Sequence, residues 1–491
     1  MSADIVARGL AIAQARSGNS AALVSAIRTN GIFPQPVFRL AANDTPVITV
    51  GVANTASTIN ANPPGNPAIL GTDTRLKWLS GPNTYDGGTG SWGPRGAWYG
   101  TGRSTQYASF EFVHTGTVFE VSCLASFFAS TNNLRLVING IVMAPVTLPN
   151  STGDNHYVKY VFPASGTRSI RVESSAGRFR GVNVVSTLEV TSSGRTVPLI
   201  SVMGDSFAEG TGAALSMDGE AVSLVRALGG NIALGAVGGI GIINPGTGGK
   251  VAWTDATRII DLTMSGVTDA AQGVSTAPAL GIVMMTINDQ GLAQSLWGAF
   301  GSSYQAAINN RCWALINAWQ SANPGKPLIF YGPTWPNGDP ALDIFRMRDA
   351  IQEACWGAAR SNVWFIDRLA PLTAVRSGAN TFVTTTGTTT NASTSITAIP
   401  STTGITLGAG IEGTGIPAGA RVASIVSATA ITIDPAATAT GTAVALTTRN
   451  THSAIYGIGP SDTTHPGQPG HNYDALWMAK EARRLILTEF A

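Results

Sequence analysis

The sequence predicts an α/β protein in which a parallel sheet with helices on both faces follows a separate antiparallel β domain. Two observations lead to this prediction. From residue 197 onward, apolar strand-like runs alternate with segments of helical period, which is typical of a parallel sheet covered on both faces. From residue 103 to 195, short alternating runs are separated by turn residues, which is typical of an antiparallel sandwich, jelly-roll-like in its spacing.

The α/β domain, residues 196–491, holds five apolar runs and several helical stripes. Apolar residues recur at helical spacing over 308–319 and 347–358, so we expect two helices that each bury one face. Asp339 and Pro340 suit the N-cap and first position of the second helix. A last helix is expected after His471, itself a packing residue at the helix start. The expected strands are Val197–Met203, Asn231–Val237, Leu280–Ile287, Pro327–Gly332 and Val363–Asp367.

The β domain, residues 46–195, is expected to consist of short strands joined by tight turns. Asn139-Gly140 lies between two apolar runs and is the strongest signal for a two-residue hairpin turn. The expected strands are Tyr107–Val113, Val118–Leu124, Leu134–Ile138, Tyr157–Phe162, Ser169–Glu173 and Val182–Val190.

Aromatic residues gather in the loop-rich start of this domain, and three of them are tryptophans. Aromatic rings can stack on sugars, and they equally fill the cores of small β domains. The sequence leaves both interpretations open. Trp78, Trp92 and Trp98 are therefore candidate substrate contacts, and the domain is a possible carbohydrate-binding domain.

Two further segments differ from their surroundings. Residues 1–45 show a helical pattern that ends at Gly31, Pro34 and Pro36, and both an ordinary surface helix pair and an attachment or oligomerisation segment fit it. Residues 378–450 have very few charges and β-branched runs at strand spacing. This indicates a small β module inserted within the α/β domain.

The composition excludes several classes of function. Charged residues make up 12% of the chain and the formal net charge is +2, so no nucleic acid or anionic membrane is expected as partner. We find no signal peptide and no apolar run long enough for a membrane span. Cysteine and histidine spacings predict no metal and no cofactor, and Cys312 and Cys355 are expected to be buried thiols.

The first apolar run of the α/β domain ends in Gly204-Asp205-Ser206, where the chain turns toward a helix. This places the Ser206 hydroxyl at the carboxyl edge of the sheet, where open α/β folds bind ligands. Asp205 is expected to shape the turn. Downstream, the spacing of Asp462 and His465 lets the carboxylate orient the imidazole while the imidazole takes the serine proton. A turn cap at Asp462 with a surface histidine is the alternative.

A serine nucleophile also needs donors for the oxyanion that forms on its substrate. Gly239 follows the second expected strand and Asn288 follows the third. If the second and third expected strands lie on either side of the first, their ends lie beside the end of the first strand, where Ser206 is expected. Gly239 could then offer its backbone N–H and Asn288 its side-chain amide, although ordinary turn and cap roles also fit these residues.

Together the four blocks resemble the SGNH, or GDSL-type, hydrolase superfamily, with Thr286 standing where that family usually has glycine. The resemblance covers residues 197–491 without the insert and implies a flavodoxin-like α/β/α fold that hydrolyses esters. It implies Ser206 as nucleophile, His465 as general base and Asp462 as the residue that orients the histidine. It also implies an oxyanion hole formed by the N–H groups of Ser206 and Gly239 and by the Asn288 amide.

Resemblance also suggests the substrate. A β-sandwich before such a domain resembles esterases that remove acetyl groups from polysaccharides, and the Thr/Gly/Ser-rich insert is similar to modules of bacteriophage tail fibres and tailspikes. We therefore expect a virion tailspike esterase that deacetylates an O-acetylated capsular or surface polysaccharide at the host cell surface. It would be a homo-oligomer, with a trimer favoured, in contact with other phage tail proteins. A non-catalytic polysaccharide-binding tail fibre protein and a lipid or short-chain esterase are the alternatives.

Overall fold

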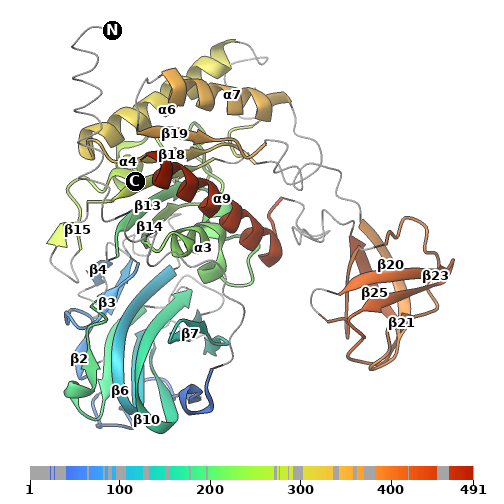
Figure 1. Cartoon of the computed structure of the whole chain (residues 1–491), viewed down its shortest axis with the longest axis horizontal. Coiled ribbons are helices and arrows are strands. Elements are labelled where there is room, and N and C mark those ends of the chain that lie inside the picture. Colours follow the sequence, from blue (N-terminus) through green and yellow to red (C-terminus); the bar gives the residue numbers. More distant parts are fainter. Residues whose placement is uncertain are drawn as a thin grey trace.

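The chain was analysed as a computed structural model (Figure 1). Its described residues form an antiparallel β domain, an α/β domain with a five-stranded parallel sheet, and a six-stranded β module. Along the chain, this module lies between the last strand of the parallel sheet and the C-terminal helix. Helices in this described part fall short of the length and apolarity that a membrane span requires. The described residues are 23, 27, 40–63, 66–80, 83–86, 91–94, 107–124, 132–149, 154–175, 178–194, 197–269, 274–275, 277–285, 287–290, 302–334, 342–357, 362–369, 382–407, 409–417, 420–449 and 464–489.

The parallel sheet has the strand order β14-β13-β17-β18-β19. The second strand along the chain therefore lies beside the first, and the third lies on its other side, which is the order that the predicted oxyanion site requires. Every neighbouring pair is parallel. The strands are β13 (Leu199–Gly204), β14 (Asn231–Ala236), β17 (Leu280–Met284), β18 (Leu328–Tyr331) and β19 (Val363–Ile366), which confirms the five expected runs.

Helices cover both faces of this sheet because strand side chains alternate between two cores. In β17, Leu280 and Ile282 pack in one core with α3 and α9, whereas Val283 packs in the other with α4, α6 and α7. Figure 1 shows α9 and α3 on one side of the sheet and α6 and α7 on the other. The helices are α3 (Glu220–Ala227), α4 (Ala256–Thr263), α6 (Ser302–Ala322), α7 (Leu342–Gly357) and α9 (Gln468–Glu489).

The two predicted helical stripes are confirmed by burial. Cys312 and Trp319 of α6 and Met347 and Cys355 of α7 are all buried in the core between the helices and the sheet. Both cysteines are free thiols, as expected. Residues 335–341, which hold the proposed N-cap of α7, lie outside the described residues.

Helix α9 begins at Gln468, earlier than the sequence predicts. Pro469 does not prevent this, because a proline in the first helical turn removes no intrahelical hydrogen bond. His471 is fully buried, and its Nε2 donates to the Thr211 carbonyl at 2.9 Å. Burial lowers the pKa of His471 to about 4. The packing role expected of His471 is therefore confirmed.

The β domain differs from the prediction in its two longest strands. The sequence predicts four short strands where the structure has β6 (Tyr107–Leu124) and β10 (Asn155–Ser175). Gly116 and Gly166 lie in the gaps expected between these strands, but they pair with each other in the ladder. A register shift next to Gly166 bends both strands without ending them.

Because of this bend, the halves of one antiparallel sheet enclose a shared core. Phe110 and Phe179 pair with different parts of the sheet, yet their ring centroids lie 4.9 Å apart. The Asn139-Gly140 turn is confirmed, with both φ angles positive. The other strands are β1 (Val47–Val50), β2 (Ile69–Leu70), β3 (Lys77–Trp78), β4 (Asn83–Asp86), β5 (Ser91–Pro94), β7 (Asn132–Ile138), β8 (Ile141–Val142), β9 (Val146–Leu148), β11 (Arg178–Val184) and β12 (Val190–Thr191).

Trp78 belongs to this core. Its side chain is 1% exposed, and its Nε1 donates to the Gly71 carbonyl at 2.9 Å. A buried indole offers no face to a sugar, so the prediction that Trp78 contacts substrate is wrong. The side chain of Trp92 and the whole of Trp98 lie outside the described part of the chain.

The inserted segment forms its own small barrel. Its sheet has the order β20-β25-β22-β23-β24-β21, and a bridge between Thr388 and Thr397 connects the last strand back to the first. Ile, Val, Leu and Ala side chains fill its separate core. The β character expected of this segment is present. The strands are β20 (Phe382–Thr389), β21 (Ser395–Ile396), β22 (Gly410–Gly413), β23 (Arg421–Ser427), β24 (Ala430–Asp434) and β25 (Gly441–Arg449).

The N-terminal segment is described at few positions. Leu23 and Ile27 are helical and fully buried in the same core as α9, and Arg483 of α9 donates to the Ile27 carbonyl at 3.0 Å. This part of the segment therefore packs on the α/β domain. An attachment role for residues 1–45 stays a prediction.

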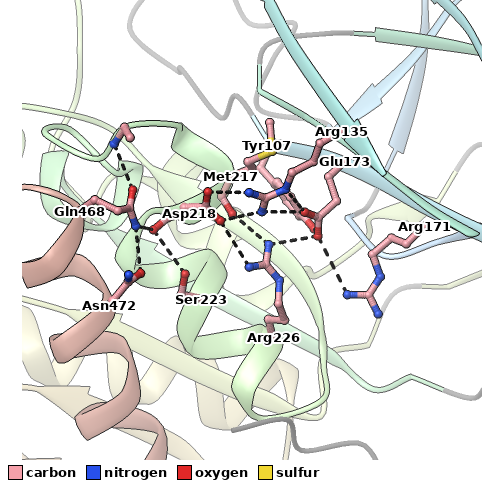
Figure 2. A network of polar contacts seen from close by, with 11 residues as sticks. Tyr107, Arg135, Arg171, Glu173, Met217, Asp218, Ser223, Arg226, Gln468 and Asn472 are labelled. Atoms are coloured by element: carbon pink, nitrogen blue, oxygen red, sulfur yellow. Dashed lines mark hydrogen bonds and ion pairs between the residues drawn. The ribbon is translucent and has the colours of Figure 1, made fainter. Parts of the chain in front are cut away.

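The β domain and the α/β domain are joined by backbone pairing and by buried charges. Ser80 forms a parallel bridge with Ile232, which covers the edge strand β14. Glu173 of β10 is fully buried and accepts hydrogen bonds from Arg135 at 2.8 Å and Arg226 at 3.0 Å (Figure 2). Burial alone would raise the pKa of Glu173, but the charges of the surrounding arginines outweigh it and lower the pKa to about 2.

Replacing Glu173 by Gln should lower the free energy of unfolding at neutral pH by about 3–5 kcal/mol, because buried Arg135 and partly buried Arg226 lose their shared carboxylate. The folded-state pKa lies below the unfolded value of 4.5, so this stabilisation is present above about pH 4.5 and is lost as the pH falls toward 2. Denaturant unfolding of both proteins at several pH values should show the difference shrinking over this range. If the difference in unfolding free energy between the two proteins did not change with pH, the role assigned to Glu173 would be contradicted.

Candidate active site

Ser206 lies at the carboxyl edge of the sheet, directly after β13. It begins the one-turn helix α2 (Ser206–Glu209), whose N-cap is Asp205. The Asp205 carboxylate accepts a hydrogen bond from the Phe207 N–H at 3.1 Å, which fixes the turn. Gly204 is required because a Cβ there would collide with the Ala208 side chain. The turn-shaping role expected of Asp205 is confirmed.

His465 reaches Ser206 from the loop before α9. Its Nε2 lies 2.8 Å from the Ser206 Oγ, although the two residues are 259 positions apart. The imidazole also packs against the Phe207 ring, with centroids 5.3 Å apart. The structure thus brings the predicted nucleophile and the predicted base within hydrogen-bond distance, close enough for direct proton transfer. Asp462 and Thr286 lie outside the described residues.

The chain between α2 and α3 supports the histidine loop. Gly212 has a φ of +89°, which favours glycine. A Cβ at Gly212 would lie 3.1 Å from the His465 Cβ and would collide with the Pro466 carbonyl oxygen. The two segments are therefore in direct backbone contact, and a displacement of one displaces the other.

The turn after β14 packs against the serine from the other side. Gly239 has a φ of +78°, and a Cβ at Gly238 would lie 3.4 Å from the Ser206 Cβ. The Gly238 N–H donates to Glu209 at 2.8 Å, and Lys250 Nζ donates to the Gly238 carbonyl at 2.7 Å. Both peptide groups around Gly238 are thus held, which fixes the backbone that leads into Gly239.

Asn288 lies beside the serine turn and is already hydrogen-bonded. Its Nδ2 lies 3.0 Å from the Asp205 Oδ2 and 3.0 Å from the Ile240 carbonyl oxygen, so both amide hydrogens have protein acceptors. Donation from this amide to an oxyanion requires one of these bonds to be exchanged. Burial raises the pKa of Asp205 well above its usual range.

Asp289 is a supporting residue that the sequence analysis missed. It is 3% exposed, and its carboxylate accepts hydrogen bonds from three successive backbone N–H groups at 2.8–2.9 Å. This fixes the glycine-rich loop after β14 that contains Gly239. The Asn-Asp pair at the end of the third strand was the signal in the sequence, but only its first member was interpreted. The three donors are Ile242, Ile243 and Asn244.

Glu209 was also missed. It ends α2 three residues after Ser206, and it holds the Gly238 N–H. Burial raises the pKa of Glu209 to about 7, against the opposing effects of that N–H and of the Lys250 charge. A carboxyl group whose pKa lies near neutral pH therefore lies close to the serine.

Comparison with known proteins gives structural likeness only. No protein-family profile matches this chain, and no curated sequence is similar to it. A family two carbohydrate esterase from Cellvibrio japonicus is 14% identical with a TM-score of 0.45, over 66% of this chain and 89% of that one. One from Clostridium thermocellum, in complex with cellohexaose, is 15% identical with a TM-score of 0.43, over 60% of this chain and 88% of that one.

An acetyl xylan esterase from the rumen bacterium Butyrivibrio proteoclasticus is 15% identical with a TM-score of 0.41. The match covers 53% of this chain and 81% of that one. At these TM-scores the likenesses carry no argument about activity, so a functional proposal has to rest on the geometry around Ser206.

Replacing Glu209 by Gln keeps an acceptor for the Gly238 N–H but removes the buried charge. The folded-state pKa of about 7 lies above the unfolded value of 4.5, so the wild-type protein should lose stability as the pH rises from about 4.5 to 7. The variant should not, and above pH 7 it should be more stable by about 1–3 kcal/mol. Thermal unfolding across this range measures the effect, and parallel pH profiles for the two proteins would refute it.

Proposed function

We propose that this protein is a serine esterase in which Ser206 is the nucleophile and His465 the general base. The observation that carries the proposal is the 2.8 Å contact between His465 Nε2 and Ser206 Oγ at the carboxyl edge of the parallel sheet. A serine becomes a nucleophile when a base lies within hydrogen-bond reach of its hydroxyl. The glycine-containing turns that pack against Ser206 and against the His465 loop keep this geometry in place.

The reaction has two halves. Ser206 Oγ bonds to the ester carbonyl carbon while its proton passes to His465 Nε2, and His465 then protonates the leaving alcohol as the carbon–oxygen bond breaks. The acyl group now sits on Ser206. Water attacks this acyl-enzyme, its proton goes to His465, and His465 returns the proton to Ser206 as the acid leaves. Asp462 would orient the imidazole through Nδ1–H.

The proposed oxyanion donors are the N–H groups of Ser206 and Gly239 and the amide of Asn288. The close packing of the Gly238 turn on Ser206 supports the first two. The bond from Asn288 to Asp205 places the amide next to the serine turn, and it would exchange its bond to Ile240 or Asp205 for the oxyanion. Donors held in advance of the reaction stabilise the developing charge most effectively.

The substrate that we propose is an O-acetylated capsular or surface polysaccharide of a bacterial host. The resemblance of the domain order to polysaccharide deacetylases supports this substrate. The resemblance of the 378–450 insert to phage tail modules supports a place in the virion tail. A homotrimer in contact with other tail proteins belongs to the same proposal.

Replacing Ser206 by Ala should reduce acetate release about 10⁴- to 10⁶-fold, because the nucleophile is removed. Acetate release is measured on p-nitrophenyl acetate, p-nitrophenyl octanoate and an O-acetylated bacterial polysaccharide. Ser201→Ala, inside strand β13 that leads to Ser206, is the matched control and should retain activity. Faster turnover of octanoate would indicate a lipid esterase, and polysaccharide binding without any turnover would indicate a binding protein. Either result contradicts the proposal.

Replacing Asp462 by Asn should lower kcat by up to about 10⁴-fold, because the imidazole loses the group that fixes its tautomer. Binding of a small ester should change little, so KM for p-nitrophenyl acetate should stay near the wild-type value. Steady-state kinetics separate the two constants. Wild-type kcat in this variant would show that another group orients His465.

A further inference from the structure

We propose that the β domain positions His465 for catalysis, through a chain of contacts that runs from Arg135 to Gln468. The inference rests on the proposed function, in which His465 is the base. Arg135 and Gln468 act here as positioning residues, since they reach the reacting atoms through segment 210–218 and the start of α9. Figure 2 shows the two residues on opposite sides of Asp218.

The first link is Arg135 of β7. Its side chain is 5% exposed, and its two terminal nitrogens each donate to one carboxylate oxygen of Asp218 at 2.6 Å. Two parallel bonds of this kind fix both the position and the orientation of a carboxylate. The Nε of Arg135 donates to buried Glu173 at 2.8 Å. Arg135 therefore ties the β domain to the α/β domain at Asp218.

The second link is Arg226 of α3, which holds the same segment from within the α/β domain. It donates to Glu173 at 3.0 Å and to the Met217 carbonyl at 2.9 Å, and it forms an ion pair with Asp218 at 3.6 Å. The guanidinium groups of Arg135 and Arg226 thus both bind Glu173, and together they bind residues 217–218 (Figure 2). Their position depends on a carboxylate supplied by the β domain.

The third link connects this segment to the histidine loop. Gln468 Nε2 donates to the Asp218 carbonyl at 2.9 Å, and Gln468 Oε1 accepts from the Ala214 N–H at 3.0 Å. The side chain also donates to Asn472 in the next turn of α9, at 2.9 Å. Both polar ends of Gln468 therefore fasten the first turn of α9 to residues 214–218. His465 lies three residues before Gln468.

The same segment supports Ser206. The N–H groups of Gly210 and Thr211 donate to the Ser206 carbonyl at 3.1 and 2.9 Å, which closes the helix that begins with the serine. Gly212 is in backbone contact with the His465–Pro466 loop. Segment 210–218 therefore touches both reacting residues. A shift of about 1 Å in such a segment can cost about 100-fold in rate, because proton transfer needs the hydrogen-bonded distance.

The β domain could act by binding carbohydrate or by positioning His465, and enzyme kinetics distinguish these two roles. A domain that only binds carbohydrate would affect the KM of a polysaccharide and leave the hydrolysis of a small ester unchanged. A domain that positions His465 affects kcat for every ester, including one too small to reach the β domain. The nearly complete burial of Arg135 and Glu173 favours the second role, because buried charge pairs hold fixed geometry.

The test compares Arg135→Met with Arg168→Met on p-nitrophenyl acetate. Arg168 is also buried in the β domain, at 1% exposure, but it bonds to Asp44 and to the carbonyl oxygens of Gly116 in β6 and Ala164 in β10. Arg135→Met should lower kcat about 10- to 100-fold with KM within about twofold of wild type. Arg168→Met should destabilise the protein and leave kcat near the wild-type value.

If Arg135→Met does not fold, Arg135→Lys takes its place, because it keeps the charge but cannot form the two parallel bonds to Asp218. Gln468→Leu provides a second variant, within the α/β domain. It should lower kcat as well, and the double variant should lose less than the product of the two single effects, because both residues act through one segment. Two results would overturn the proposal. One is a double variant whose loss of kcat equals the product of the two single losses, and the other is a change in these variants only in the KM for an acetylated polysaccharide.

Hydrogen exchange of residues 464–472 supplies a readout that does not need turnover. It should accelerate in Arg135→Met and Gln468→Leu but not in Arg168→Met. Unchanged exchange together with unchanged kcat would refute the positioning role. If the wild-type protein hydrolyses no ester, the proposed function fails, and the exchange rates alone decide whether Arg135 fixes the histidine loop.

Discussion

The hydrogen-bonded contact between Ser206 and His465 is the constraint on which the account depends. It joins residues 259 positions apart and leaves a 2.8 Å distance between Nε2 and Oγ. Several independent features maintain it. The strand order places the serine between two other strand ends, α9 packs its apolar face on the sheet beside α3, and segment 210–218 contacts both reacting residues. The geometry of the candidate site therefore depends on several elements of the α/β domain and not on one loop.

Two buried glutamates show how the surroundings decide what a carboxylate does. Glu173 is enclosed by arginines, so its pKa falls to about 2 and its charge holds the domains together. Glu209 has fewer compensating partners, so burial raises its pKa to about 7. The first carboxylate contributes stability and the second contributes a titration near neutral pH beside the serine. Glu209 acts directly beside Ser206, through the Gly238 N–H, whereas Glu173 acts through arginine side chains.

Sequence reasoning located the five parallel strands because buried parallel strands are continuous apolar runs that need no knowledge of distant partners. It placed Ser206 after the first of these strands for the same reason, and it placed His465 in the loop before the last helix because glycine and proline residues surround it. It failed where distant pairing overrides local signals. Gly116 and Gly166 lie where breaks between strands were expected but pair across a bent sheet, and Trp78 fills a core made by strands from elsewhere in the chain. The Arg135–Asp218 pair spans 83 positions and has no local pattern.

A covalent probe tests the central claim most directly. A fluorophosphonate reacts with a serine hydroxyl that a neighbouring base has activated and forms a stable adduct, which peptide mass spectrometry can locate. The account predicts an adduct on Ser206 in the wild-type protein and its loss in a His465→Ala variant. An adduct on another residue, no adduct at all, or equal labelling of Ser206 without His465 would contradict the account.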